Sequence, residues 1–190
     1  MLALTQPAEA KIVYTKAHHR IGATQSYDLD LNKDGLVDFA IGERSSSQGG
    51  GDSWNELAIS PVGGNAVEGA IACGFLGYYR CASALKPGTR VGPRQTFSSH
   101  SHQIMAQFGC SDGGCTTIGQ WANVKNRYLG LKFHIGKAIH YGWARMSVSV
   151  QKLTITATLT GYAYETVPNK WITTGETKGP DVIKLEPGAL

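Results

Sequence analysis

The stretch YLGLKFHIGKAIHYGWARMSVSV, residues 128–150, decides how the rest of the sequence is interpreted. Large apolar residues alternate with small or polar ones in both halves, and a period of two is the signature of a β-strand. Gly136 and Lys137 lie between the halves, and a glycine at the first position of a two-residue loop favours a type II′ turn. The stretch therefore predicts a β-hairpin with long arms.

A two-residue turn also fixes the register of this hairpin, because Ile135 must then pair with Ala138. Four further pairs follow, the first two on the expected core side and the others on the opposite face: Leu129 with Ala144, Phe133 with His140, Gly130 with Trp143, and Tyr128 with Arg145. Alternation resumes over 155–165 and predicts a third strand. Such a meander needs a second apolar layer, so we expect an antiparallel β-sandwich.

The rest of the chain has the composition of an all-β protein. Its 190 residues include 24 glycines, and turn residues separate short apolar runs throughout. Further strands are expected at 12–14, 37–41, 54–62, 66–72 and 96–108, and a Gly- and Pro-rich excursion at 73–94. A short helix fits only within 56–72. No apolar run approaches the roughly 18 residues of a transmembrane helix.

We divide the chain into three parts: an N-terminal arm or residual signal segment at 1–10, a β-sandwich domain at 11–168, and an extended C-terminal tail at 169–190. Residues 8–10 are Ala-Glu-Ala, a pattern found before secretory cleavage sites. Both ends carry apolar residues, and either can become ordered by adding a strand to a sheet edge. We expect self-association through one terminus, into a filament or a ring, with folding back onto the same chain as the alternative.

The four cysteines fall into two close pairs, Cys73 with Cys81 and Cys110 with Cys115. Four cysteines allow three disulfide pairings, and short loops close most easily, so we predict the local one. Zinc binding is the alternative, but neither pair has the C-x2-C spacing. Two disulfides predict an oxidising compartment.

The segment DLDLNKDGLVDF, residues 28–39, carries oxygen side chains at alternate positions followed by a glycine. This spacing lets a loop curl around a hard cation, so calcium is the expected cofactor. The predicted ligands are the side chains of Asp30, Asn32 and Asp34, the carbonyl of Leu36, and Asp38 directly or through water. Asp28 either joins them or points away. The alternative is a metal-free turn rich in Asp and Asn.

Three weaker candidate sets remain. His100 and His102 would share one face of a strand and could bind a transition metal, although no third ligand is evident. Glu56, Glu68 and Glu165 could supply a glycosidase pair. The aromatic residues Trp54, Trp121, Trp143, Trp171, Tyr78 and Tyr79 form either a sugar-stacking platform or part of the core.

Two parts of the chain, 11–45 and 127–180, resemble a group of mostly uncharacterised, secreted bacterial all-β proteins. The similarity is carried by KIVYT and YDLDLNKDGLVDFAI in the first part, and by RYLGLKFHIGKAIHYGWARMSVSV and ITATLTGYAYETVPNKWITTGETKGP in the second. The aspartate-rich segment is similar to the calcium loops of integrin-type propeller blades and dockerin-like segments. The resemblance implies export and an extracellular β-domain, and implies no enzymatic activity.

The formal net charge of +4 is spread thinly, which argues against a nucleic-acid partner. No G-x-S-x-G, H-E-x-x-H or phosphate-binding glycine motif appears. The sequence therefore predicts a secreted, non-enzymatic structural or adhesive protein of a bacterial surface or matrix, stabilised by calcium. The alternative is a carbohydrate-binding module that uses calcium and exposed aromatic rings to bind polysaccharide. A hydrolase with a dispersed site is a third possibility.

Overall fold

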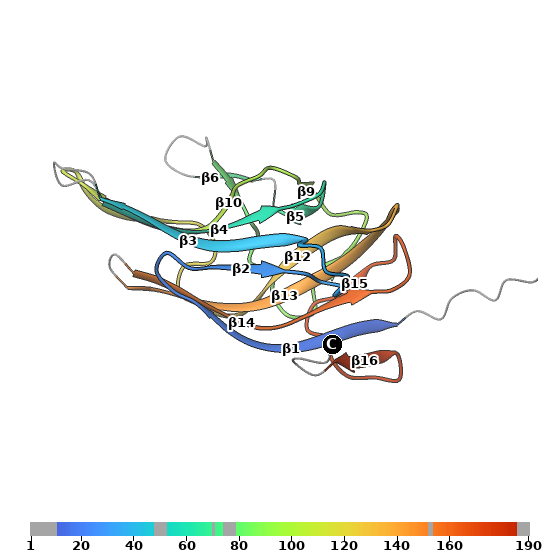
Figure 1. Cartoon of the computed structure of the whole chain (residues 1–190). Coiled ribbons are helices and arrows are strands. Elements are labelled where there is room, and N and C mark those ends of the chain that lie inside the picture. Colours follow the sequence, from blue (N-terminus) through green and yellow to red (C-terminus); the bar gives the residue numbers. More distant parts are fainter. Residues whose placement is uncertain (1–10, 48–52, 70, 74–78, 152–153, 186–190) are drawn as a thin grey trace, which may run out of the picture.

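The computed structural model describes residues 11–47, 53–69, 71–73, 79–151 and 154–185, and no helix occurs among them. The strands form three sheets (Figure 1). Sheet A has the order β16-β1-β14-β13-β12-β5-β9, sheet B has the order β2-β3-β4-β10-β7-β6 with β11 paired to β10, and sheet C is β15-β8. The predicted all-β class is confirmed, and the helix allowed within 56–72 does not form.

The strands have the following bounds. Sheet A consists of β1 (Ile12–Ile21), β5 (Ala66–Glu68), β9 (Phe97–Ser98), β12 (Val124–Ile135), β13 (Ala138–Gln151), β14 (Thr154–Glu165) and β16 (Val182–Leu185). Sheet B consists of β2 (Ser26–Leu29), β3 (Phe39–Ser47), β4 (Ser53–Pro61), β6 (Ile71–Cys73), β7 (Tyr79–Cys81), β10 (Gln103–Ser111) and β11 (Gly114–Ile118). Sheet C consists of β8 (Arg90–Val91) and β15 (Ile172–Thr173).

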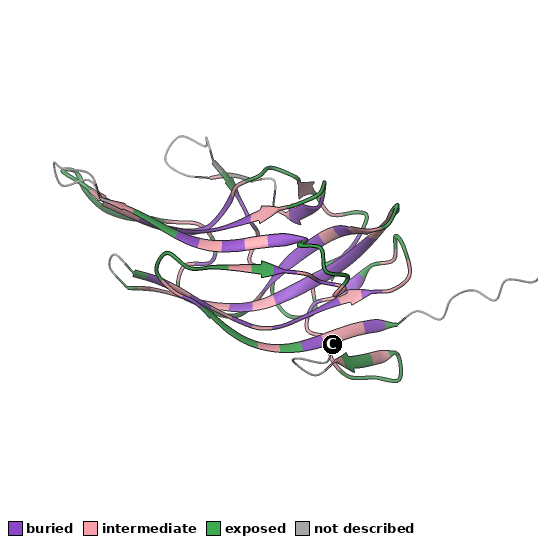
Figure 2. Cartoon of the chain, in the orientation of Figure 1, coloured by how far each residue is buried: buried purple, intermediate pink, exposed green. Residues whose placement is uncertain are grey.

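Sheets A and B face each other in a sandwich-like arrangement, and the buried segments lie mainly between them (Figures 1 and 2). Sheet B contributes Phe39, Ile41 and Leu57 to this main core, and sheet A contributes Leu129 and Met146. Apolar residues occupy the faces of sheets A and B that meet in this core. The outer face of sheet B, in contrast, carries small and polar residues.

The predicted hairpin is present with its predicted register. Ile135 pairs with Ala138, and the four further pairs are those expected from the turn. Gly136 has φ +60°, whereas Lys137 stays out of the left-handed region, as a type II′ turn requires. The third strand pairs with β13 over Thr154 to Tyr164, with one register shift near Arg145.

The outer face of sheet A is also buried, which the sequence prediction did not include. A second core lies on this face and contains Trp143, Tyr128, Tyr141, Val91 and Ile172. The last two belong to sheet C, so the excursion and the C-terminal segment together cover sheet A. Trp143 is fully buried and lies between Gly130 and Ala163 on the neighbouring strands, where small residues leave room for its indole.

Several predicted strands have different bounds. The strand expected at 37–41 begins at Phe39 and continues to Ser47. The one expected at 66–72 is two strands, β5 in sheet A and β6 in sheet B, so the chain changes sheets after Gly69. The one expected at 96–108 is interrupted between Ser98 and Gln103.

The C-terminal segment folds back onto its own chain. β15 pairs with β8, and β16 pairs with β1 in parallel, with Val182 beside Ile12. The tail expected at 169–190 therefore forms part of two sheets up to Leu185. The segment 1–10 lies outside the described residues, as do residues 186–190.

Both predicted disulfides are present, Cys73–Cys81 and Cys110–Cys115. The first joins the end of β6 to the end of β7. The second joins directly opposed residues of the β10–β11 hairpin. Together they account for all four cysteines of the chain.

Glu68 places a carboxyl group against the second core. Its Oε2 is buried without a hydrogen-bond partner, and its side chain lies over Gly130, where a β-carbon would come within 2.6 Å of Oε2. Burial raises the pKa of Glu68 to about 7. This acid is therefore neutral in the folded protein at weakly acidic pH.

We predict that Gly130→Ala lowers the free energy of unfolding by about 2 kcal/mol, because the new methyl group would overlap Glu68 and Leu85 in a packed site. Urea denaturation measures the change. Gly113→Ala is the control, since its β-carbon would meet only the Ser111 hydroxyl at 3.8 Å. Equal stability of the two variants would contradict the close packing of Glu68 and Leu85 over Gly130.

We predict a pH dependence of stability that belongs to Glu68. Its folded pKa of about 7 exceeds the ordinary value of 4.5, so the folded state holds the proton more tightly between these values. The free energy of unfolding should fall as pH rises from about 4.5 to 7 and then level off. The total loss should be about 1–2 kcal/mol, less than the full pKa difference implies, because the carboxyl group retains some solvent access. Glu68→Gln should remove this slope in denaturation series at fixed pH, whereas Glu176→Gln, an exposed control, should retain it. A slope that persists in Glu68→Gln would assign it to other groups.

Candidate functional site

The aspartate-rich segment forms the loop between β2 and β3, from Asp30 to Asp38. Asp30 organises the loop, because its carboxylate accepts hydrogen bonds from the backbone N–H groups of Lys33 at 2.6 Å, Asp34 at 3.3 Å and Gly35 at 2.8 Å. Lys33 and Gly35 have φ +60° and +86°. The chain thus curls around the Asp30 carboxylate, as a short polar segment does in an Asx-type turn.

Asn32 and Asp34 lie together in the same loop. Asp34 accepts hydrogen bonds from the side-chain amide of Asn32 at 2.9 Å and from the backbone N–H of Leu36 at 2.9 Å. The amide oxygen of Asn32, in contrast, is buried without a hydrogen-bond partner. A buried oxygen without a donor is costly, and a cation is one of the groups that can satisfy it.

Asp38 has a different position from the other predicted ligands. It is buried, and its carboxylate accepts hydrogen bonds from the Leu31 N–H at 2.8 Å and from the Asn65 amide at 2.9 Å. Burial raises the pKa of Asp38, and the charges of Asp30 and Asp34 add to the rise. Three carboxylates therefore lie close enough to repel one another.

A short chain of buried hydrogen bonds connects this loop to sheet A. Asn65 donates to Asp38 with its amide nitrogen and accepts from the backbone N–H of His134 at 3.0 Å with its amide oxygen. Since His134 belongs to β12, the loop at the edge of sheet B is joined to the central hairpin of the opposite sheet. Any group that orders the loop also supports the contact between the sheets.

The loop thus brings Asp30, Asn32 and Asp34 together, with Leu36 bonded to Asp34, while Asp38 turns to Leu31 and Asn65. Asp28 lies outside the loop on β2, where it is exposed and pairs with Ala40. Among the described residues, no three His, Cys, Asp or Glu side chains gather at one point in a way that would hold a metal ion. A cation here would depend on amide and carbonyl oxygens in addition to carboxylates.

A second candidate site is a trough on the outer face of sheet B. Its floor consists of Ala40, Gly42, Ala58 and Ser60, whose small side chains leave a hollow of about 530 Å³. The other lining residues are Thr24, Gln25, Ser26, Glu43, Arg44, Ser101 and His102. The trough is therefore polar along its walls and has small side chains on its floor.

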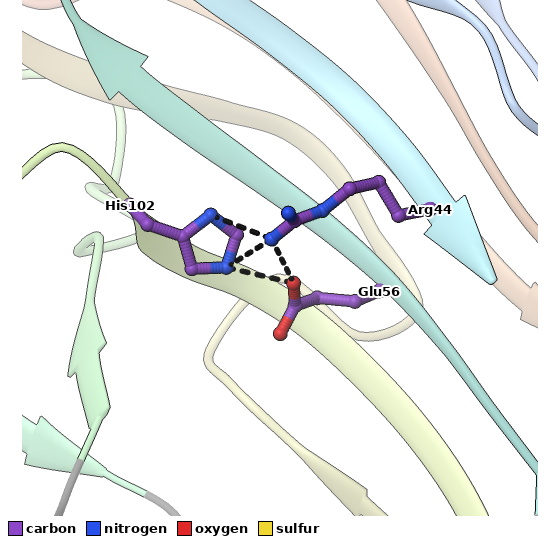
Figure 3. A network of polar contacts seen from close by, with 3 residues as sticks. All are labelled: Arg44, Glu56 and His102. Atoms are coloured by element: carbon purple, nitrogen blue, oxygen red, sulfur yellow. Dashed lines mark hydrogen bonds and ion pairs between the residues drawn. The ribbon is translucent and has the colours of Figure 1, made fainter. Parts of the chain in front are cut away.

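Arg44, Glu56 and His102 form a network at one end of the trough (Figure 3). An Nη atom of Arg44 lies 3.1 Å from Glu56 Oε1 and within 2.9 Å of both ring nitrogens of His102. His102 Nε2 lies 2.7 Å from the same Glu56 oxygen. The Glu56 side chain is only 6% exposed, whereas that of Arg44 is 59% exposed. The buried carboxylate thus holds Arg44 and His102 in place while the guanidinium faces solvent.

A further buried pair supports the trough from the core side of sheet B. Glu43 accepts hydrogen bonds from the Asn55 amide at 2.9 Å and from the Thr24 N–H at 2.6 Å. Thr24 has φ +57° in the turn before β2. This pair attaches the wall at Thr24 and Gln25 to β3 and β4, so the trough is held by the sheet.

A pocket of about 380 Å³ lies on the same face beyond the network, and we call it the Trp54 pocket. It is lined by Ser53, Trp54, Gln107, Gly109, Cys110, Ser111, Gly114, Thr116 and Ile118. Trp54 is half-buried and pairs with Gly109 across the ladder, while Gln107 pairs with Glu56. The disulfide Cys110–Cys115 fixes the hairpin on which the pocket is built.

The trough and the Trp54 pocket together make the sheet-B groove. Glu56 lies between them on β4, with Trp54 on one side and Ser60 on the other. Trp54 and Ser60 are six positions apart along β4, which corresponds to about 20 Å. An extended ligand must therefore span about this length to reach both hollows.

The remaining sequence candidates do not converge. His100 and His102 lie in the loop between β9 and β10, not on a strand, and both ring nitrogens of His102 contact Arg44. Trp121 and Trp143 are fully buried, so the platform of four tryptophans does not form. Trp54 and Trp171 reach solvent. Tyr78 lies outside the described residues.

Comparisons of the chain with protein families, with curated proteins and with solved structures found no match. The site is therefore interpreted from its own geometry. Sequence analysis did not single out Arg44, Glu43 or Asn55, and it considered Glu56 and His102 for other roles. The signal for the network is the opposite charge of Arg44 and Glu56 in the β3–β4 ladder, which becomes visible only once the register is known.

Proposed function

We propose that this chain is an extracellular, calcium-stabilised β-sandwich that binds a polysaccharide along the sheet-B groove. The observation that carries the proposal is the groove itself, with its small floor, fixed polar walls and one tryptophan. The proposed function combines the carbohydrate-binding alternative that the sequence suggested with the adhesive role of the main sequence prediction.

The chemistry of the groove suits a chain of linked sugar units. Sugars present hydroxyl groups that need both donors and acceptors, which Arg44, Gln107 and Ser60 supply. Their apolar C–H faces pack on an aromatic ring, and Trp54 lines the pocket at one end. Because Glu56 fixes Arg44 and His102 before the ligand arrives, little conformational entropy is lost on binding.

Binding is favoured over hydrolysis by the positions of the acidic residues. Glu56 lies on the outer face of sheet B, Glu68 lies over Gly130 on the outer face of sheet A, and Glu165 forms an ion pair with Lys170 at 3.2 Å. A glycosidase needs two carboxyl groups on either side of one bond, about 5–10 Å apart. These three residues belong to separate layers or partners, so a non-enzymatic role is proposed.

Calcium is assigned a stabilising role in the loop from Asp30 to Asp38. The unpartnered Asn32 oxygen, the mutual repulsion of three carboxylates and the turn at Gly35 support this assignment. The buried link through Asn65 to His134 explains how an ion in this loop would stabilise the whole sandwich.

An extracellular location is supported by the two disulfides, which persist in oxidising surroundings. Within the described residues no helix is long and apolar enough to cross a membrane. A bacterial surface or matrix stays a proposal that rests on the resemblance noted above.

Self-assembly through the C-terminus has less support than polysaccharide binding. β16 already occupies the edge of its own sheet beside β1, so its donation to a neighbour would first require these strands to separate. Assembly through residues 1–10 stays a prediction from the sequence.

We predict that calcium raises the melting temperature of the chelator-treated protein, by the equivalent of about 2.7 kcal/mol at a hundredfold excess over Kd. Replacement of Asp30 and Asp34 with Asn should abolish this response and lower stability. Asp28→Asn is the matched control and should retain it, since Asp28 lies on β2 outside the loop. Scanning calorimetry with and without chelator measures all three proteins. A wild-type melting temperature that ignores both calcium and chelator would refute the metal assignment.

For the groove, we predict retardation of the protein in native gels that contain one of the soluble neutral polysaccharides β-glucan, xylan or mannan. Trp54→Ala should weaken the retardation about tenfold in Kd, or about 1.4 kcal/mol, through loss of the stacking surface. Trp171→Ala removes another solvent-accessible ring on a different layer and should leave it unchanged. Migration unaffected by all three polysaccharides, or equal losses in both variants, would count against the proposed function.

A further inference from the structure

We infer that a second ligand site, for an acidic sugar unit, lies on sheet C at the opposite side of the molecule from the sheet-B groove. Its lining residues are Arg90, Pro93, Arg94, Gln95 and Trp171, which enclose about 270 Å³. The inference does not depend on polysaccharide binding by the groove, because sheet A and sheet B lie between the two sites.

The site is built on a fixed frame. Val91 and Ile172 pair across sheet C and are both buried in the second core, which anchors β8 with its residue Arg90 and also β15, which begins directly after Trp171. The Thr174 hydroxyl accepts a hydrogen bond from the Thr89 N–H at 2.9 Å and donates one to the Lys86 carbonyl at 2.8 Å. Arg90 therefore lies on an anchored strand and Trp171 directly precedes one, whereas Pro93, Arg94 and Gln95 form the turn that follows β8.

Close packing also fixes the position of Trp171. A β-carbon on Gly92 would lie 2.6 Å from the Trp171 β-carbon, so only glycine lets the two segments approach this closely. The backbone N–H of Gln95 donates to the Gly92 carbonyl at 3.2 Å and closes the turn that carries Pro93 and Arg94. Trp171 is nevertheless 42% exposed, which is unusual for a ring placed so firmly.

Two guanidinium groups supply positive charge without a carboxylate partner. Arg90 lies over the Trp171 ring, with its Cζ 4.2 Å from the ring centroid, and this cation–π contact restrains the side chain. Neither Arg90 nor Arg94 forms an ion pair with any acidic residue in the part of the chain that the structure describes. Both side chains are exposed, so they are available to an anion from solution.

The combination points to one ligand class. Guanidinium groups bind carboxylates through paired N–H donors, the Gln95 amide can bond hydroxyl groups, and Trp171 with Pro93 offers an apolar surface for a ring. The volume of the site exceeds that of a small inorganic anion and is large enough for a sugar ring. We therefore assign the site to a uronic acid unit of an acidic polysaccharide.

The test is calorimetric titration of the intact protein with a galacturonic acid trisaccharide at low salt, with a neutral trisaccharide and with sodium sulfate as separate ligands. The uronate should bind, and its affinity should fall as salt is added, because the attraction is between exposed charges. Arg94→Gln and Arg90→Gln should each weaken binding about tenfold. The indole N–H resonance of Trp171, identified with Trp171→Phe, should shift on titration.

Matched variants separate this site from general charge and from the groove. Lys178→Gln removes one positive charge from the same C-terminal segment but does not line the pocket, and it should change uronate affinity less than about twofold. Trp54→Ala, which affects the groove, should leave uronate binding unchanged. Absence of uronate binding, equal binding of sulfate, or equal losses in Arg94→Gln and Lys178→Gln would each overturn the assignment. Uronate binding that survives when neutral polysaccharides fail would refute the groove proposal alone.

Discussion

The structure depends on the burial of sheet A on both faces. Each long strand of the hairpin must supply large side chains to the main core and to the second core at once. A shift of the register by one residue would therefore exchange the side chains that face the two cores. Trp143 shows the constraint most clearly, because its indole fits only where Gly130 and Ala163 stand beside it. Sheet B has one buried face, so its outer face is free to carry a hollow lined by small and polar residues.

Local patterns in the sequence account for the parts of the fold that local rules determine. The hairpin, its turn and its register follow from alternation around Gly136, and the disulfides follow from short spacing. The second core could not be predicted in this way, because it joins Val91 to Ile172 over a long separation in the chain. The same limit applies to the network of Arg44, Glu56 and His102, since His102 reaches Glu56 only after β10 has paired with β4.

The two candidate sites of sheet B use buried acids in different ways. Glu56 orients exposed groups on the surface, whereas Asp38 turns inward and connects the loop of Asp30 to the opposite sheet through Asn65. The predicted ligand set grouped Asp38 with Asp30 and Asp34 from spacing alone. Spacing could not show that the buried amide of Asn65 would donate a hydrogen bond to one carboxylate oxygen of Asp38, because Asn65 follows 27 positions later in the chain.

The pairing of β1 has a consequence for the order in which the chain folds. Its neighbours in sheet A are β14 and β16, and Ile12 pairs with Glu165 and Val182. During synthesis from the N-terminus, β1 therefore has no partner in sheet A until β14, which begins at Thr154, has been made. Contacts of such long range slow the search for the native state, and an unpaired strand is open to wrong pairing in the meantime. Sheet A thus takes its final form only after β14 and β16 have been synthesised and have paired with the strand that was made long before them.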